Sequence, residues 1–383
     1  MAPPKAGPKV TSFRQPAAMR HVLVVRVINI NTVTGKRLSR KTGKQMVAKT
    51  VQSRWLSILV PVYNVVPYLA ECVASIMDQI DEDGVEVILL DDASTDGSCV
   101  LCSKLVEQYA PRLQWLVHPE NRGLSAARNT MIEAASGEYM WFIDSDDFML
   151  PGAIARLRQI ITAHKADIIL CDYRKQGEHC ASFAGQGFQA VNDREALVRG
   201  LFTRRRMHVW TKISRRALWI TGLKFPAGRA FEDVATMPWL FLRAQSYYYH
   251  AEPWLEYRVR SDSITGQISR SKGRFDTAKN DDLAKSLVGF REDLGAAIPE
   301  LHDDTRYAIA YFCDKEYTKI GWRLLSRRLF RDPPAHLFAE LRRYRAMMEV
   351  CSPWPFARVL REHIRRRYFV RWAVLAIFMG LSR

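Results

Sequence analysis

The sequence predicts an α/β fold in which a mostly parallel sheet carries helices on both of its faces. Short apolar runs, such as VEVILL at 85–90, are typical of buried parallel strands, and they alternate about four times with stretches of helical spacing. Acidic and polar residues come directly after several of these runs. Because the carboxyl ends of parallel strands meet at one edge of a sheet, we expect a ligand site at that edge.

The elements follow from the apolar runs and from the residues that end them. Asp83-Gly84 predicts a turn, Gly137 ends a helix, and Pro151 opens a helix at its first turn. After Arg174 the pattern loosens into shorter elements, and beyond Asp276 it indicates mostly helices. In chain order we predict strand 56–60, helix 65–79, strand 85–90, helix 96–109, strand 113–117, helix 125–135, strand 139–143, a helix from 151 and strand 167–171.

The charge of the chain is concentrated in its two ends. Residues 1–54 hold twelve Lys or Arg and no acid, and residues 320–383 hold fourteen Arg and four acids. The ends therefore contribute about +12 and +10 to a net charge of +17, which leaves the middle at about −5. A folded middle that is acidic argues against a nucleic-acid partner, whereas basic ends suit an anionic membrane surface.

The cysteines and the apolar segments set further limits. Seven cysteines, an odd number, do not form a disulfide framework, and the Cys99/Cys102 pair lacks the second pair of a zinc site, so we expect reduced thiols in the cytosol. No stretch reaches the roughly 18 apolar residues of a membrane span. The tail from Arg361 has a basic cluster followed by apolar residues, which predicts an interfacial helix with Trp372 and Phe378 in lipid. The alternative is a helix packed on the protein's own core.

Four polar clusters follow the predicted strands. They are PVYN from Pro61, DDASTDG from Asp91, ENRGLSAARN from Glu120 and DSDD from Asp144. Carboxylates that crowd together at one sheet edge repel one another, and a cation removes that conflict. Hard oxygen ligands suit Mg²⁺ or Mn²⁺ that shares phosphate oxygens with a substrate. The residues alone therefore predict a divalent cation and a phosphorylated ligand.

These four segments, in this order, resemble the bacterial glycosyltransferase family 2. Its GT-A domain carries PVYN, DDGSTDGS, ENxGLSAARN and DSDD, and the chain departs from the second motif only in having Ala93 where glycine is usual. The resemblance continues through HVWTKISRRAL at His208, LKFPAGRAFED at Leu223 and YRVRSDSIT at Tyr257. It covers about 55–266, a little over half of the chain.

The resemblance implies a role for each matching residue. Asp144 and Asp146 form the DxD pair that would bind Mn²⁺ or Mg²⁺. Asp233 would be the general base that removes the acceptor proton, with inversion at the anomeric carbon, and Glu232 is the less favoured candidate. The residues that would bind the nucleotide sugar are Pro61, Tyr63, Asp91, Asp92, Arg128, Asp144, Ser145 and Asp147.

The resemblance also implies a division of the chain. Residues 1–53 would be a basic, flexible extension, 54–266 the GT-A catalytic domain, and 267–383 a helical region with the basic amphipathic tail. Within the catalytic domain, 54–175 would hold the nucleotide sugar and 176–266 the acceptor.

The activity implied is the transfer of one hexosyl or N-acetylhexosaminyl group, from UDP by family habit, to a saccharide or lipid-linked acceptor. Such an enzyme would serve lipopolysaccharide, capsule or exopolysaccharide synthesis as a peripheral protein on the inner face of the bacterial plasma membrane. Processive relatives carry Q-x-x-R-W beyond the base; here Gln52-Ser53-Arg54-Trp55 lies before it and has the wrong spacing. We therefore expect one sugar per encounter.

Other interpretations remain open from the residues alone. The chain could be an inactive relative, another nucleotide-dependent transferase on a similar fold, or, less favoured, a basic nucleic-acid-binding protein. A nucleotidyltransferase would show a glycine-rich basic loop near the first strand, and PVYNVVPYL has neither feature. Ser94 and Asp96 fit a helix cap better than a ligand contact, and Asn121 and Asn129 fit turn or loop positions.

Overall fold

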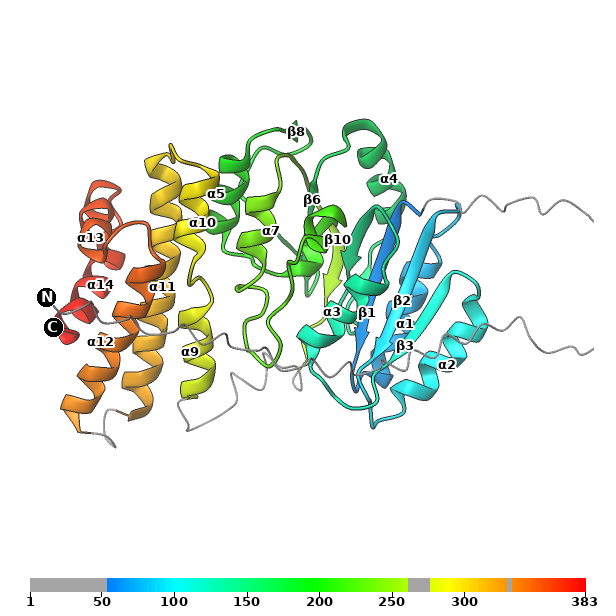
Figure 1. Ribbon diagram of the computed structural model, residues 1–383, viewed down its shortest axis with the longest axis horizontal. Coiled ribbons are helices and arrows are strands. Elements are labelled where there is room, and N and C mark those ends of the chain that lie inside the picture. Colours follow the sequence, from blue (N-terminus) through cyan, green and yellow to red (C-terminus); the bar gives the residue numbers. More distant parts are fainter. Residues whose placement is uncertain (1–53, 261–275, 329–332) are drawn as a thin grey trace, which may run out of the picture.

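The computed structural model describes residues 54–260, 276–328 and 333–383. The predicted extension 1–53 and the predicted domain boundary at 266/267 lie outside these residues. The described part is elongated, with a sheet and its covering helices at one end and a bundle of helices at the other (Figure 1).

The first half of the sheet region contains the elements that the sequence predicts, with small shifts at their ends, and a short strand, Phe148–Met149, that the sequence did not predict. The helix expected from Pro151 begins at Ala153 instead, because Pro151 and Gly152 form a turn in which Gly152 has φ 84°. The elements are β1 (Leu56–Val62), α1 (Val66–Met77), β2 (Val85–Asp91), α2 (Ser98–Tyr109), β3 (Leu113–Val117), α3 (Leu124–Ala134), β4 (Tyr139–Phe142), β5 (Phe148–Met149), α4 (Ala153–His164) and β6 (Ile168–Lys175).

The remaining elements are shorter strands and then helices. The sheet region continues with β7 (Glu178–Cys180), β8 (Ala190–Val191), α5 (Arg194–Arg204), η1 (Val209–Thr211), β9 (Lys212–Arg215), α6 (Ala217–Ile220), α7 (Met237–Arg243) and β10 (Tyr247–Tyr257). The helical region consists of α9 (Thr277–Lys285), α10 (Phe290–Ala297), α11 (Asp303–Arg328), α12 (Pro334–Cys351), α13 (Phe356–Arg365) and α14 (Phe369–Leu381).

The strands form one mostly parallel sheet in the order β3-β2-β1-β4-β9-β6-β10-β5. The neighbours β3, β2, β1 and β4 are all parallel, and so are β6 and β10. Strand β9 lies antiparallel between β4 and β6. The predicted α/β fold is therefore confirmed, with one reversed strand in the middle that no local pattern indicated.

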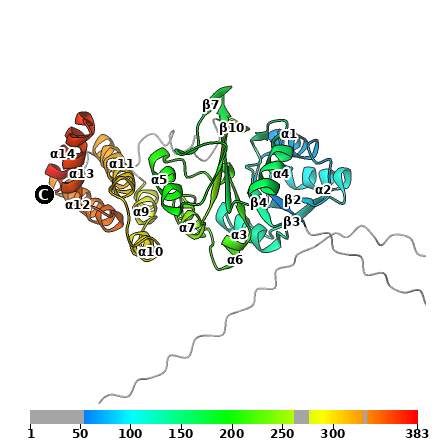
Figure 2. The same cartoon turned by 90° about the horizontal axis from the view of Figure 1, so that it is seen from above.

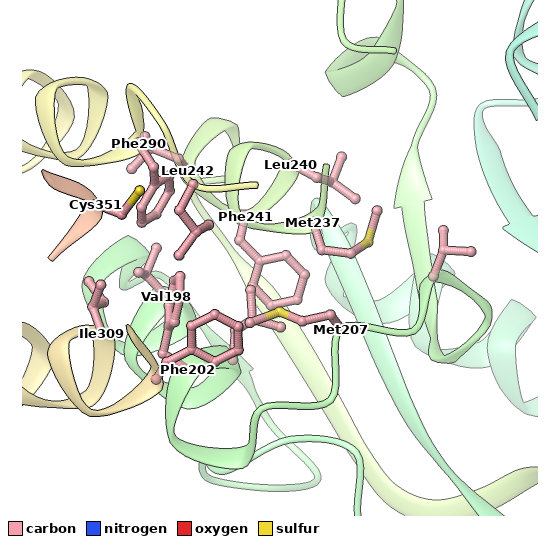
Figure 3. Packing of buried hydrophobic residues seen from close by; sticks show 14 of the residues in the cluster. Val198, Phe202, Met207, Met237, Leu240, Phe241, Leu242, Phe290, Ile309 and Cys351 are labelled. Atoms are coloured by element: carbon pink, nitrogen blue, oxygen red, sulfur yellow. The ribbon is translucent and has the colours of Figure 1, made fainter. Parts of the chain in front are cut away.

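Helices cover both faces of the sheet (Figure 2). A separate apolar core lies on each face. On one face, Leu69 of α1 and Leu157 of α4 pack over the strands. On the other face, Met131 of α3 begins a core that continues through α5 and α7 into the helices beyond α9. Figure 3 shows Phe202 of α5 and Phe241 of α7 in this shared core, together with side chains of the helical region. The helical region is thus attached to the sheet region by a common core.

The C-terminal helix α14 is packed against α11 through a glycine. Gly321 has no side chain, and a Cβ atom placed there would lie 2.4 Å from the ring of Phe378. Phe378 is therefore 1% exposed, and the hydroxyl of Tyr317 donates a hydrogen bond to its carbonyl oxygen at 3.0 Å. The prediction that Phe378 enters lipid is wrong, because this ring fills the space that Gly321 leaves. Trp372, in contrast, is 39% exposed.

The structure bears on two further predictions, one for the cysteines and one for membrane-spanning helices. All seven cysteines are free thiols, and Cys102 is buried in α2. Among the described helices, none combines the length and the apolar character that crossing a bilayer requires.

Candidate active site

The carboxyl ends of β1, β2 and β3 lie side by side, which brings the first polar clusters together. Val62 at the end of β1 is in register with Asp91 at the end of β2. The next backbone N–H groups continue the ladder: Asp92 donates to Val62 at 2.9 Å, and His118 donates to Asp91 at 2.9 Å. The sheet edge that the sequence predicts as the ligand site is therefore built from these residues.

Tyr63 and Asp91 form one wall of this edge. Pro61 is buried within β1, and the Tyr63 side chain directly beyond it is 48% exposed. Asp91 is 1% exposed; its Oδ2 accepts a hydrogen bond from the N–H of Ser94, whereas its Oδ1 accepts none from the described residues. A buried carboxylate oxygen without a donor fits a ligand that supplies one, such as a base N–H or a ribose hydroxyl.

Asp92 fastens the loop that precedes α3. Its Oδ1 lies 2.6 Å from Nδ1 of His118 and accepts the N–H of Arg122, and its Oδ2 accepts the N–H of Gly123 at 2.7 Å. Burial acts to raise the pKa of Asp92, but these hydrogen bonds outweigh burial and hold the pKa below its usual value. Both oxygens are thus engaged by the protein, and direct contact of Asp92 with a nucleotide stays a prediction.

The Asp91–Gly97 turn is held by its own side chains. Asp96 accepts the N–H groups of Val66 and Ser98 at 3.0 and 2.9 Å, so it joins the starts of α1 and α2. Ser94 accepts the N–H of Asn64 at 3.1 Å. Asp96 thus binds the first N–H group of each helix from outside the N-cap positions, which are Val65 and Gly97, whereas Ser94 joins two loops and caps neither helix. Ala93, which replaces the usual glycine, has φ 59°, a left-handed conformation that glycine adopts more easily.

Arg128 lies at the centre of the site and joins its two halves. The side chain is 2% exposed; Nη2 donates to Asp144 at 3.2 Å, and Nη1 donates to Glu232 at 3.0 Å and to Asp233 at 2.9 Å. Burial acts to lower the pKa of Arg128, but the carboxylates of Asp233, Asp144 and Glu232 outweigh it and raise the pKa. One guanidinium therefore connects the DxD motif with the ED pair, and its contact with Asp233 spans 105 residues of sequence.

Asn129, the next residue, lies in helix α3 and not in the turn or loop that the sequence suggests. Its side-chain amide donates to the carbonyl of Phe225 at 2.8 Å, and its carbonyl oxygen accepts the N–H of Phe225 at 2.9 Å. The Phe225 ring lies 5.2 Å from the guanidinium carbon of Arg128. The pair of hydrogen bonds thus positions a ring under Arg128.

The DSDD loop is held by two arginines that the sequence analysis missed. Asp147 accepts the N–H of Arg258 at 2.8 Å, and the Arg258 side chain donates to the carbonyl of Asp146 at 3.0 Å. Nε of Arg260 lies 2.9 Å from the Asp146 carboxylate. Both arginines belong to the RVR segment within YRVRSDSIT. Their spacing of two places them on one side of an extended strand end, and that signal could have paired them with the acidic loop.

The acids of this loop are close enough to affect one another. Burial, followed by the charges of Asp144 and Asp146, raises the pKa of Asp147 to about 9. Burial and the charge of Asp144 also raise the pKa of Asp146. Asp144 and Asp146 have side chains 29% and 20% exposed, whereas Asp147 and Ser145 are 2% and 5% exposed. Asp144 and Asp146 are therefore the members of the loop that a ligand can reach.

Asp233 lies in a turn over residues 232–236, directly before α7, which begins at Met237. Its Oδ1 accepts Nη1 of Arg128, its Oδ2 accepts the N–H of Val209 at 3.3 Å, and the side chain remains 19% exposed. Burial raises the pKa of Asp233 to about 7, against the opposing charge of Arg128. A carboxylate with a pKa near 7 that faces solvent has the properties of a general base.

Trp210 and Lys212 are buried next to Val209, whose N–H group contacts Asp233. Nζ of Lys212 donates to the carbonyls of Arg206 and His208 at 2.8 and 2.6 Å, and burial lowers the pKa of Lys212 to about 7. The ring of His208 stacks on Trp210 with centroids 4.9 Å apart. Trp210, Lys212 and, further along the sheet, His250 are all less than 5% exposed. Trp210 and Lys212 are therefore packing residues next to the site, and His250 packs on Trp254 instead.

The donor set fits a divalent cation that a substrate completes. No group of three or more His, Cys, Asp or Glu side chains in residues 54–260, 276–328 and 333–383 is arranged as a complete metal site. Mg²⁺ is usually bound by one or two carboxylates together with waters and substrate phosphates. Asp144 and Asp146 offer two hard oxygen donors at an exposed edge, and their crowding with Asp147 favours a positive ion there.

A family profile and several curated glycosyltransferases match this chain. A profile described as "Glycosyl transferase family 2" matches residues 57–215. The glycosyltransferase GlyG of Streptococcus pneumoniae serotype 4 is 33% identical over 224 residues, which are 55% of this chain and 73% of GlyG. The glycosyltransferase GlyA of the same organism is 29% identical over 221 residues, and there the chain spans 31% of the relative's length.

Solved structures share the fold over most of the chain. Residues 1–349 of S. aureus TarS match with a TM-score of 0.61 and 17% identity, covering 86% of this chain and 92% of that one. The same TarS fragment in complex with UDP-GlcNAc matches with a TM-score of 0.56 and 19% identity, covering 85% and 92%. At these identities the likeness establishes the fold, and it includes the helices that follow the sheet region.

Proposed function

Because the chain belongs to glycosyl transferase family 2, we propose that it moves a single sugar, with inversion, from a nucleotide sugar to an acceptor hydroxyl. The observation that carries this proposal is Arg128, which lies within 3.2 Å of Asp144 on one side and 2.9 Å of Asp233 on the other. An inverting displacement needs a leaving diphosphate and a base on opposite sides of the reacting carbon. A single buried guanidinium fixes the relative position of the motifs assigned to these two tasks.

The residues of the site supply the parts of the reaction as follows. Asp144 and Asp146 would hold a Mn²⁺ or Mg²⁺ ion, which when bound supplies Lewis-acid stabilisation of the leaving diphosphate. Asp233 accepts the proton of the acceptor hydroxyl as that oxygen attacks the anomeric carbon. Arg128 holds Asp233 in place, and Val209 restricts its second oxygen through a backbone N–H at 3.3 Å.

We infer that the donor is a UDP-sugar bound against Pro61, Tyr63 and Asp91. Support comes from the exposed Tyr63 ring and from the Asp91 oxygen that has no donor among the described residues. TarS, whose fold is similar, was solved with UDP-GlcNAc, and this favours a hexose or N-acetylhexosamine on the same carrier. Asp92, Ser145 and Asp147 would shape this pocket from buried positions.

For the acceptor, we propose a saccharide or lipid-linked saccharide in the synthesis of a cell-surface glycan. The acceptor would be presented at the cytoplasmic side of an anionic membrane, to which the basic C-terminal tail is suited. The chain covers only part of the length of some relatives, so its acceptor is assigned from chemistry alone.

The proposal is tested by donor hydrolysis with purified protein and a panel of nucleotide sugars, with Mn²⁺ or Mg²⁺. We expect slow release of nucleoside diphosphate from one donor, which EDTA and the substitution Asp146→Asn both abolish. Asp303→Asn, a substitution of a half-exposed carboxylate on α11, serves as the control and leaves the rate unchanged.

Two results would contradict the proposal in different ways. Hydrolysis that persists in EDTA would remove the metal from the mechanism and leave the transfer intact. A protein that turns over no donor and binds no nucleotide in calorimetry would instead be an inactive relative.

A further inference from the structure

The outward side of α14 is apolar along its whole length. Phe369, Val370, Trp372 and Ile377 are 59%, 78%, 39% and 57% exposed, and we call these four side chains the α14 face. The sole charged residue within α14 is Arg371, which donates to Asp314 at 2.8 Å in the buried interior of the bundle. Its charge is therefore directed away from the α14 face.

The inward side of the same helix is also apolar, since Leu375 and Phe378 are buried against α11 and α12. A helix that is apolar on all sides is normally covered on all sides. In the described residues the α14 face has no such cover, although exposed aromatic and aliphatic side chains of this size favour removal from water.

Four arginines between 361 and 367 precede the α14 face in the sequence, and two of them have no acidic partner among the described residues. Residues 363–383 contain no Asp or Glu. Arg366 is paired with Asp304 on α11, and Arg365 with Glu362 on its own helix, but Arg361 and Arg367 are exposed and have no ion pair within the described residues. Tyr368, which stands between Arg367 and Phe369 in the sequence, is 49% exposed.

We propose that the α14 face docks on an anionic lipid bilayer, with Arg361, Arg365 and Arg367 at the headgroups. Apolar side chains inserted at the level of the acyl boundary, aromatic residues at the interface and basic residues beside them are the features of an interfacial helix. A second copy of the chain fits less well, because it carries the same unpaired arginines next to the same face, and these repel one another, whereas anionic headgroups attract them.

This inference rests on the proposed function only for its biological purpose, since a lipid-linked acceptor would be found at the same surface. Binding itself requires no donor, metal or acceptor. A protein that binds vesicles and transfers no sugar would therefore refute the function alone, and one that transfers sugar without binding vesicles would refute the docking alone.

The test is co-sedimentation of the full chain with phosphatidylcholine vesicles that contain or lack phosphatidylglycerol. We expect binding to the anionic vesicles that weakens in high salt. Arg361→Gln with Arg367→Gln should lower the partition coefficient about 25-fold, at about fivefold for each arginine. Val370→Glu with Ile377→Glu should lower it at least about tenfold, because carboxylates replace inserted side chains.

A matched variant controls for surface charge and folding. Val100→Glu with Ile220→Glu makes the same two substitutions at helix positions 62% and 58% exposed, remote from α14, and should sediment like the unaltered protein. Donor hydrolysis in solution should be the same in all these variants. Equal sedimentation of the Val370/Ile377 variant and the unaltered chain would overturn the proposal. So would a dimer that this variant converts to monomer, which would assign the α14 face to a second copy.

Discussion

Asp233 is subject to opposing influences on its charge. Arg128 and the N–H of Val209 favour the carboxylate, while burial and the neighbouring Glu232 favour the protonated acid, and the resulting pKa is about 7. Because a protonated acid cannot accept the acceptor's proton, the transfer rate should rise as the pH rises through about 7. This expectation is checked by measuring kcat/KM over about 1.5 pH units on either side of the Asp233 pKa of about 7.

Substitutions can distinguish the role of Asp233 from that of Glu232. Asp233→Asn should lower kcat by about 10²- to 10⁴-fold and leave the donor Kd nearly unchanged, because the nucleotide wall is formed by other residues. Glu232→Gln is the matched control, since Glu232 shares the same Arg128 nitrogen at 3.0 Å and should retain most of the rate. A larger loss with Glu232→Gln than with Asp233→Asn would assign the base to Glu232.

The sequence predicted which residues belong to the site, but not how they contact one another. Asp91, Asp144 and Asp233 could be placed at the site because they stand at strand ends or in motifs of a known pattern. The contacts of Arg128 with Glu232 and Asp233 could not be predicted, because they depend on how distant loops meet. The same holds for the pKa of Asp233, which burial determines and sequence spacing does not express.

Among the elements, those with a continuous apolar run were predicted well. Strands β1 and β2 are buried along their whole length, so composition alone indicated them. Strand β9 was missed, because its four residues, KISR, contain a single aliphatic side chain. Its place between β4 and β6 comes from long-range pairing, which a local pattern does not record.

The packing of α14 on α11 gives a prediction about stability. Gly321→Ala would place a Cβ atom 2.4 Å and 2.6 Å from two ring carbons of Phe378. The ring is buried and has little room to move, so we expect the free energy of unfolding to fall by about 1–3 kcal/mol in urea denaturation. The displaced α14 should also increase the accessibility of Trp372 to a fluorescence quencher.

Gly295→Ala is the corresponding control in α10. A Cβ atom at Gly295 would meet nothing within 4 Å, and alanine favours helix by about 1 kcal/mol over glycine. This variant should therefore be as stable as the unaltered protein or more so. If both alanine variants behaved alike, the close packing of α14 on Gly321 would be wrong.

At the scale of the whole molecule, the shared core makes the sheet region and the helical region depend on each other. Phe202 of α5 is fully buried, and its ring lies 5.5 Å from both Phe290 of α10 and Phe312 of α11. Phe202→Ala should lower the free energy of unfolding by about 3–5 kcal/mol, because it opens a cavity where the two regions join. Phe188→Ala, at a position 54% exposed, should cost far less.

The same experiment tests whether the regions unfold together. We expect tryptophan fluorescence and far-ultraviolet circular dichroism to give coincident transitions in the unaltered protein. Two separated transitions would mean that the sheet region and the helices are independent units. The sequence did not predict this continuity: it indicated mostly helices beyond Asp276, and that position marks where the secondary structure changes and not where the core ends.

The elongated arrangement places α14 at one end of the long axis and the nucleotide half, with α2 and β3, at the other (Figure 1). A bilayer that holds α14 would therefore leave the sheet region standing away from the lipid. The distance between the bilayer and the site would then select acceptors by length. A sugar attached directly to its lipid would not reach Asp233, while the end of a longer glycan would. Chain length, as well as sugar identity, would decide which acceptors are extended.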